Sequence, residues 1–318
     1  MITRETVLIL GAGASIPYGM PSGEGLRTAI LGLQQSPNLF DRAGLGLVLD
    51  EWTAFRAAFH YSQRPSIDSF LGEQQQFRDI GSQAIAAHLL QCEFNGEETL
   101  FADATAGHWY RLLFSAMTEH SDWDDLDFSH LKVITFNYDR TLERFLMVAL
   151  RAAYQRSETE AWAKLGELAI EHVYGSLSAP RPTPSQDYLA YGCGVSPQTV
   201  QIASRALRLM RDKVKDDEHI TRCKQWLAAA ERVAILGFSF DQINTDRLAL
   251  ASIIGPRVNQ QRSPPVTFAA TRFRLSNLQA RRAAHRCGFK ALAADELNAH
   301  FFELDCAGLL KEALFLDE

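Results

Sequence analysis

The sequence has no long apolar segment, no long basic tail and no closely spaced pair of cysteines, and each absence excludes a class of protein. No apolar run reaches the roughly 18–20 residues that a helix needs to cross a bilayer, so we expect no membrane association. The five cysteines are scattered without C-x-x-C spacing, which gives no metal-binding signature and favours reduced thiols in the cytoplasm. The polar start from Met1 to Thr6 resembles neither a secretory signal nor a transit peptide, which also favours a cytoplasmic protein.

Composition and charge are those of an ordinary globular protein. A chain of 318 residues with 47% hydrophobic residues can bury a large core, so we expect one domain over residues 1–318. The net charge of −6 and the lack of a basic tail argue against direct nucleic acid binding.

Apolar runs of the β type recur along the chain, with helical patterns between nearly all of them. This alternation predicts an α/β fold with a doubly wound, mostly parallel, Rossmann-like sheet. The predicted strands are Val7–Leu10, Leu131–Phe136, His172–Leu177, Val233–Phe240 and Val266–Ala270, with a weaker sixth at Phe289–Ala293.

The first two predicted strands are about 120 residues apart, far more than one crossover helix needs. Most of that interval has helical patterns, and Ser66 after Pro65 is a candidate N-cap. We therefore predict an inserted, mainly helical lobe over residues 24–125 that covers a ligand.

A glycine turn, Gly11-Ala12-Gly13-Ala14-Ser15, follows the first predicted strand directly. Such a turn presents backbone N–H groups, and then a helix N-terminus, to a phosphate at the carboxyl edge of a sheet. Ser15 either bonds the phosphate or only caps the helix. Ile16 stands where the dinucleotide fingerprint has its third glycine, and no acidic residue closes a second strand about 20 residues on, which disfavours a nicotinamide dehydrogenase.

Polar residues end two later strands at the same predicted edge. Asn137 and Asp139 follow the second strand, where an asparagine can orient a water or a ribose hydroxyl and an aspartate can accept from an amide. The alternative is an Asx turn in which Asp139 caps the next helix. After the fourth strand, Gly237, Ser239 and Asn244 fit either a backbone close to a ligand or a bulge and a solvated turn.

His172 and Tyr174 lie two residues apart in the third predicted strand, so we expect both side chains on one face. A neutral imidazole is the usual general base for a water or hydroxyl near neutral pH. A hydrogen-bonded structural histidine is the alternative.

Taken in order, the four motifs resemble the sirtuin-like (silent information regulator two) NAD-binding superfamily, and more closely its divergent bacterial branch of antiphage-defence NAD hydrolases. The resemblance implies that the glycine turn, Gly11 to Ser15, holds the NAD pyrophosphate, with Gly175 also near the cofactor. It implies that Asn137 is the catalytic asparagine beside the nicotinamide ribose, and that Asp139 faces the carboxamide. On the adenosine side, the implied contacts are Gly237, Ser239 and Asn244.

Two departures from the family pattern matter. The family has a histidine directly before the glycine of the third motif, where this chain has Tyr174; we expect His172 to act as the base, with Tyr174 as the alternative. The zinc-binding C-x-x-C pairs of protein-deacetylating sirtuins are missing, which disfavours a deacylase.

The expected function is therefore hydrolysis of NAD, as substrate, to nicotinamide and ADP-ribose by an effector that depletes NAD during abortive infection. Such an activity needs control, so we expect a homo-oligomer, a separately encoded sensor or regulatory protein, or both. The alternative is an inactive NAD- or ADP-ribose-binding sensor or regulatory subunit, which the Tyr174 substitution favours.

Overall fold

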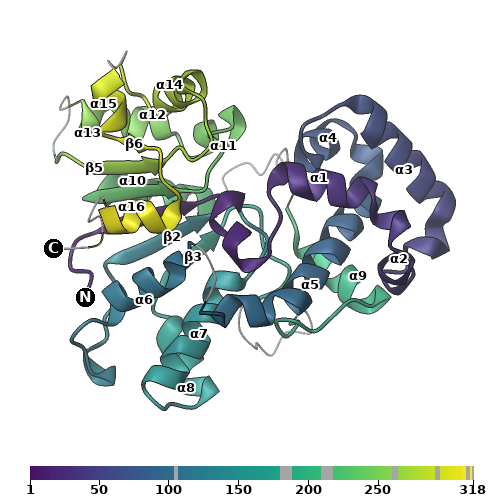
Figure 1. Cartoon of the computed structure of the whole chain (residues 1–318), viewed down its shortest axis with the longest axis horizontal. Helices are drawn as coiled ribbons and strands as arrows, with labels where there is room; N and C mark the ends of the chain where they lie inside the picture. Colours follow the sequence, from purple (N-terminus) through teal and green to yellow (C-terminus); the bar gives the residue numbers. More distant parts are fainter. Residues whose placement is uncertain are drawn as a thin grey trace.

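A single parallel sheet organises the computed structural model, which describes residues 1–103, 107–179, 188–208, 218–259, 264–290, 294–312 and 316. Within these residues the sheet has six strands in the order β3-β2-β1-β4-β5-β6, all parallel, with helices on both faces (Figure 1). The fold is therefore α/β and Rossmann-like, as the sequence predicts. The strands are β1 (Thr6–Leu10), β2 (Leu131–Thr135), β3 (Ala169–His172), β4 (Arg232–Leu236), β5 (Thr267–Thr271) and β6 (Phe301–Phe302).

The strand register brings the predicted motifs to one edge. Leu10 pairs with both Thr135 and Leu236, and Thr135 pairs with His172. The last residues of β1, β2, β3 and β4 therefore stand side by side, and the polar residues after them share the carboxyl edge. The strand order reverses between β1 and β4, which is where open α/β sheets bind ligands.

The third strand differs from its prediction. It covers Ala169–His172 instead of His172–Leu177, because Gly175 has a φ of +71° and its N–H turns back to the carbonyl oxygen of His172. The fourth strand likewise ends at Leu236, earlier than predicted, because Gly237 has a φ of +59°. Both glycines stop a strand that the apolar pattern alone would continue.

The weak sixth strand is also misplaced in the prediction. Phe289 and Lys290 have no regular structure, the rest of Phe289–Ala293 lies outside the described residues, and the sixth strand is Phe301–Phe302. Phe289 is buried against Phe268 and Phe301, so its apolar character reflects core packing.

Side chains of the central strands alternate between two cores. Val7, Ile9 and Ile134 face one core, whereas Leu8 and Val133 face the other. Helices α10 (Glu218–Ala229), α12 (Leu250–Ile253) and α14 (Asn277–Arg286) complete the first. Helices α6 (Trp109–Thr118), α7 (Thr141–Ala153), α8 (Glu158–Leu165) and α16 (Cys306–Glu312) complete the second.

A group of helices from the interval between β1 and β2 stands beside the sheet (Figure 1). It contains α1 (Gly23–Leu31), α2 (Pro37–Arg42), α3 (Leu49–Ser62), α4 (Ile67–Glu73) and α5 (Arg78–Phe101), with α9 (Pro197–Ala206) packed on α5. Ser66 caps α4 by accepting a hydrogen bond from the Ser69 N–H at 3.2 Å, as predicted. Helix α6, although inside residues 24–125, packs on the sheet, and the lobe boundary remains a prediction.

The remaining short helices are α11 (Gln242–Arg247), α13 (Gly255–Val258) and α15 (Ala294–Asn298). In the described part of the chain, every helix is too short or too polar to cross a lipid bilayer.

Candidate functional site at the carboxyl edge of the sheet

The glycine turns after β1 and β4 pack backbone against backbone. The Gly13 N–H donates to the carbonyl oxygen of Gly237 at 2.8 Å, and a Cβ on Gly11 would lie 2.6 Å from that same oxygen. A Cβ on Gly237 would lie 2.1 Å from the nitrogen of Ala14. Glycine is therefore required at both turns, and the two motifs form one surface at the point where the strand order reverses.

The chain after Gly11 forms two short 3-10 turns, Ala12–Ala14 and Ile16–Tyr18, before α1 begins at Gly23. No long helix starts at the glycine turn, contrary to the expectation of a helix N-terminus there. The Gly13 N–H is already engaged with Gly237 and is not free to donate to a ligand. Among the described residues, the N–H groups of Ala12 and Ser239 donate to no other group and can receive an oxygen ligand.

Nearly all polar atoms of Asn137 form hydrogen bonds within the protein. Its side-chain Nδ2 donates to the carbonyl oxygen of Gly11 and to the Ser15 hydroxyl, both at 3.0 Å. Its N–H donates to Thr135 Oγ1 at 3.1 Å, and its carbonyl oxygen accepts from His172 Nδ1 at 2.9 Å. Because the Gly11 oxygen can only accept, the orientation of the amide is determined, and Oδ1 has no partner within the described residues.

Ser15 connects this amide to Asp139. The Ser15 hydroxyl donates to Asp139 Oδ1 at 3.2 Å, and the Thr141 N–H and hydroxyl donate to the same oxygen. The Thr141 hydroxyl also contacts the Tyr110 hydroxyl at 2.7 Å. Burial raises the pKa of the Asp139 carboxyl group, although the hydrogen bonds from Thr141 lower it. Asp139 thus combines the predicted Asx turn with a direct link to the glycine turn.

His172 approaches the main chain of Asn137 and not its amide. The Asn137 carbonyl oxygen can only accept, so Nδ1 carries a proton, while Nε2 lies 2.7 Å from Glu143 Oε1 on α7. Burial would lower the pKa of His172, but the Glu143 carboxylate, together with the Asn137 carbonyl oxygen and Asp139, outweighs burial and raises it. Both ring nitrogens are therefore engaged, Nε2 with the Glu143 carboxylate and Nδ1 with the Asn137 carbonyl oxygen, a geometry that lends no support to a general base acting at Asn137.

Tyr174 faces away from His172, so the expectation that both share a strand face is wrong. Because β3 ends at His172, Tyr174 lies in a turn and packs on Phe136 in the core opposite to α7. Its hydroxyl donates to Asn244 Oδ1, and Arg247 lies over its ring. The third and fourth motifs are thereby joined to each other.

Gly175 and Ser239, two other predicted ligand contacts, lie outside the side-chain hydrogen-bond network of Asn137. A Cβ on Gly175 would lie 2.3 Å from the carbonyl oxygen of Ala206, so this glycine admits the end of α9. Ser239 is exposed beyond the Gly237 turn and remains accessible to a ligand.

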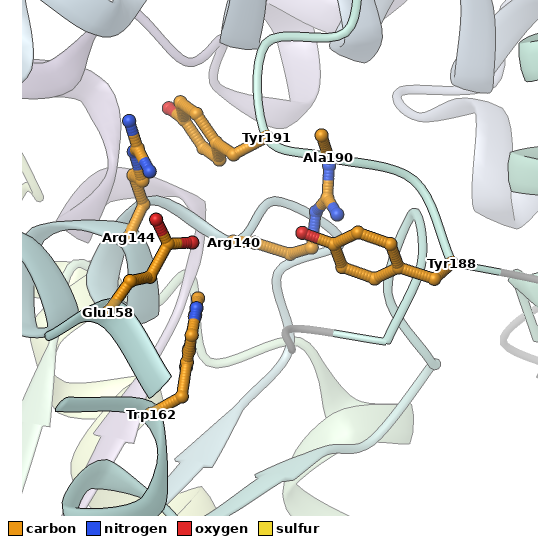
Figure 2. A pocket seen from close by; sticks show the side chains of 7 residues that line it. All are labelled: Arg140, Arg144, Glu158, Trp162, Tyr188, Ala190 and Tyr191. Carbon is orange, nitrogen blue, oxygen red and sulfur yellow. The ribbon is translucent and has the colours of Figure 1, made fainter. Parts of the chain in front are cut away.

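Two cavities lie beside α7 and α8, away from the Asn137 amide. The first has a volume of 230 Å³ and contains the guanidinium groups of Arg140 and Arg144, which are already paired with Glu93 and Glu97. Figure 2 shows all of its lining residues: Arg140, Arg144, Glu158, Trp162, Tyr188, Ala190 and Tyr191. The second, of 320 Å³, is lined by Glu143, His172, Glu171 and Arg208 among others.

The residues of the amide network are buried. Asn137 is 8% exposed and Ser15 is 2% exposed, and neither lines these two cavities.

Sequence reasoning missed Glu143, Glu93 and Asp68. Glu143 has a detectable signal, because it occupies an apolar stripe of α7 with Met147 and Leu150. The partners of the other two are visible only in three dimensions: Glu93 pairs with Arg140 at 2.6 Å, and Asp68 accepts from the Tyr138 hydroxyl at 2.6 Å.

Comparison with protein-family models gives no match, and comparison with curated proteins gives none either. Among the described residues, no cluster of three or more His, Cys, Asp or Glu side chains could hold a metal ion. All five cysteines are free thiols.

Proposed function

We propose that this chain binds NAD at the joined glycine turns and hydrolyses its nicotinamide–ribose bond. The observation that carries the proposal is the fixed amide of Asn137, whose Oδ1 remains as an open acceptor beside Gly11 and Ser15. An acceptor held by a rigid network can orient a water molecule or a ribose hydroxyl without reorganisation.

The chemistry requires little proton transfer before bond cleavage. The C–N bond to the pyridinium breaks, and its electron pair leaves with nicotinamide as a neutral molecule. Water then adds to the oxocarbenium-like ribose and loses a proton, giving ADP-ribose. Asn137 Oδ1 would direct that water, and Asp139 would bond the carboxamide. Such a dissociative reaction depends on orientation more than on a strong base, which is consistent with the engaged ring of His172.

The biological role proposed with this activity is NAD depletion in bacterial antiphage defence, in the cytoplasm. This part rests on the family resemblance of the four motifs. Assembly into homo-oligomers, or a separate sensor protein, would control the reaction.

The decisive experiment is incubation of the purified chain with NAD, alone and with its co-encoded neighbour. We expect release of nicotinamide and ADP-ribose, and we expect Asn137→Ala to reduce the rate by about 100-fold or more, as for loss of a key polar group in a pre-organised site. Full activity of the variant would show that the site is assigned to the wrong residue. An acetylated peptide in the same assay tests deacylation, which would yield O-acetyl-ADP-ribose.

A second candidate function is a sensor or regulatory subunit that holds NAD or ADP-ribose without cleaving it. The observation that favours it is the engagement of both candidate bases, since His172 is paired with Glu143 and Tyr174 donates to Asn244. Calorimetric binding of ADP-ribose without nicotinamide release under every condition would support this alternative.

A further inference from the structure

Glu143 is a buried acid on an apolar helix face. Its side chain is 4% exposed, and Leu146, Met147 and Leu150 follow it on the buried side of α7. A carboxylate in such surroundings needs a partner, because burial of an unpaired charge is costly. That partner is His172 at the end of β3.

His172 transmits this interaction to Asn137. Its Nε2 bonds Glu143 and its Nδ1 donates to the Asn137 carbonyl oxygen, so the ring bridges α7 and the segment after β2. The Asn137 N–H is bonded to Thr135 on the other side of the same residue. The main chain of Asn137 is thus fixed from two directions before its side chain meets Gly11 and Ser15.

We propose that Glu143 is a positioning residue that acts through His172 to hold the Asn137 peptide, and with it the open Oδ1, in one place. The inference deepens the proposed function and rests on it for its catalytic consequence. It assigns His172 the role of a charged structural bridge between Glu143 and Asn137, in place of the role of a base.

The charged groups around His172 determine how pH affects the bridge that its ring forms between Glu143 and Asn137. Glu143 faces it from α7, Asp139 lies after β2, and Glu171 precedes it on β3. Arg208, after α9, lines the same cavity, while His219 and Arg222 of α10 pair with Glu171. Of the charged groups in the described part of the chain, Glu143 is the one that bonds the ring directly, so Glu143 should control the protonation of His172.

Two substitutions of Glu143 separate positioning from simple stability. A glutamine can donate to a neutral His172 Nε2 and keep the contact, so Glu143→Gln should retain kcat and lose the alkaline fall in kcat that we expect for the wild type. Glu143→Leu removes the contact and should lower kcat by about 10- to 100-fold, with KM within about threefold, as for a small misplacement of a reacting group. Glu171→Gln is the matched control: it changes a carboxylate in the same cavity and should leave kcat, KM and the pH profile unchanged.

A measurement without turnover separates this inference from the proposed function. The side-chain amide signals of Asn137, followed by NMR, should shift and exchange faster with water in Glu143→Leu but not in Glu171→Gln. Unchanged signals in Glu143→Leu would overturn the positioning role whether or not NAD is cleaved. If the wild type releases no nicotinamide while the signals still shift, the proposed function fails and the positioning role stands. Should Glu143→Leu fail to fold, a Glu143→Gln pH profile identical to that of the wild type would overturn the inference.

Discussion

Ser15 couples the glycine turn to two residues of the segment after β2. It accepts from Asn137 Nδ2 and donates to Asp139 Oδ1, so one hydroxyl satisfies two buried groups of the segment after β2. Buried donors that lose their partner pay a desolvation cost, which makes this hydroxyl important for stability as well as for the site.

Replacing Ser15 by alanine should destabilise the fold by about 1–3 kcal/mol, because the Asn137 amide loses one acceptor inside the protein. Urea unfolding measures the change. Ser239→Ala is the matched control, because Ser239 is exposed and should change stability by less than about 0.5 kcal/mol. Equal effects of the two substitutions would contradict the network.

His172 makes stability depend on pH. Glu143 raises the pKa of His172 in the native state against the effect of burial. The contribution of His172 to the free energy of unfolding is therefore complete below its unfolded pKa of about 6.5, and it is lost as pH rises through the native pKa. The wild type should therefore lose stability relative to His172→Gln on going from neutral to alkaline pH, by at most about 1.4 kcal/mol per pH unit. Thermal melts of both proteins at matched pH values test this; parallel curves would contradict it.

At the scale of elements, the turns after β1 and β4 are built as a pair. Neither tolerates a side chain, because each glycine stands against the main chain of the other turn. The two strands are neighbours over their whole length, which brings the turns together without a long loop.

Gly237→Ala should cost about 3 kcal/mol or more, since it combines a positive φ with a Cβ placed against Ala14. Gly23→Ala is a suitable control because a Cβ there meets nothing within 4 Å, and an alanine near a helix start should be neutral or slightly stabilising. Calorimetric melting of the two variants distinguishes the outcomes, and equal melting temperatures would refute the packed-turn description.

On the scale of the whole molecule, buried polar contacts attach the helical group to the sheet. Glu93 and Asp68 on α5 and α4 bond Arg140 and Tyr138, which flank Asp139 after β2. The helices beside the sheet are therefore tied to the same segment that carries the candidate site.

Glu93→Gln should destabilise the protein by about 3–5 kcal/mol, because the buried guanidinium of Arg140 would lose its counter-charge. Glu97→Gln is the matched control: Glu97 pairs with Arg144 at the surface and should cost no more than about 1 kcal/mol. Chemical denaturation compares the two, and the prediction is wrong if the two variants lose the same stability.

Local pattern predicted the fold class and most of the strands. The runs at Val7–Leu10 and Leu131–Phe136 are rich in apolar and β-branched residues. Such residues favour the extended conformation of a strand, so the local sequence is enough to predict these two strands. The pattern failed at His172–Leu177, because an apolar run continues past the point where Gly175 turns the chain.

The sequence by itself determined the parallel sheet and the gathering of its polar strand ends at one edge, because apolar runs and glycine turns act over a few residues. Only the tertiary structure decided which atoms meet there. His172 bonds Glu143 and Tyr174 bonds Asn244 across 29 and 70 residues of sequence, so these partners depend on helix packing that no local pattern encodes. The same packing places His172, the expected base, in a buried pair with Glu143.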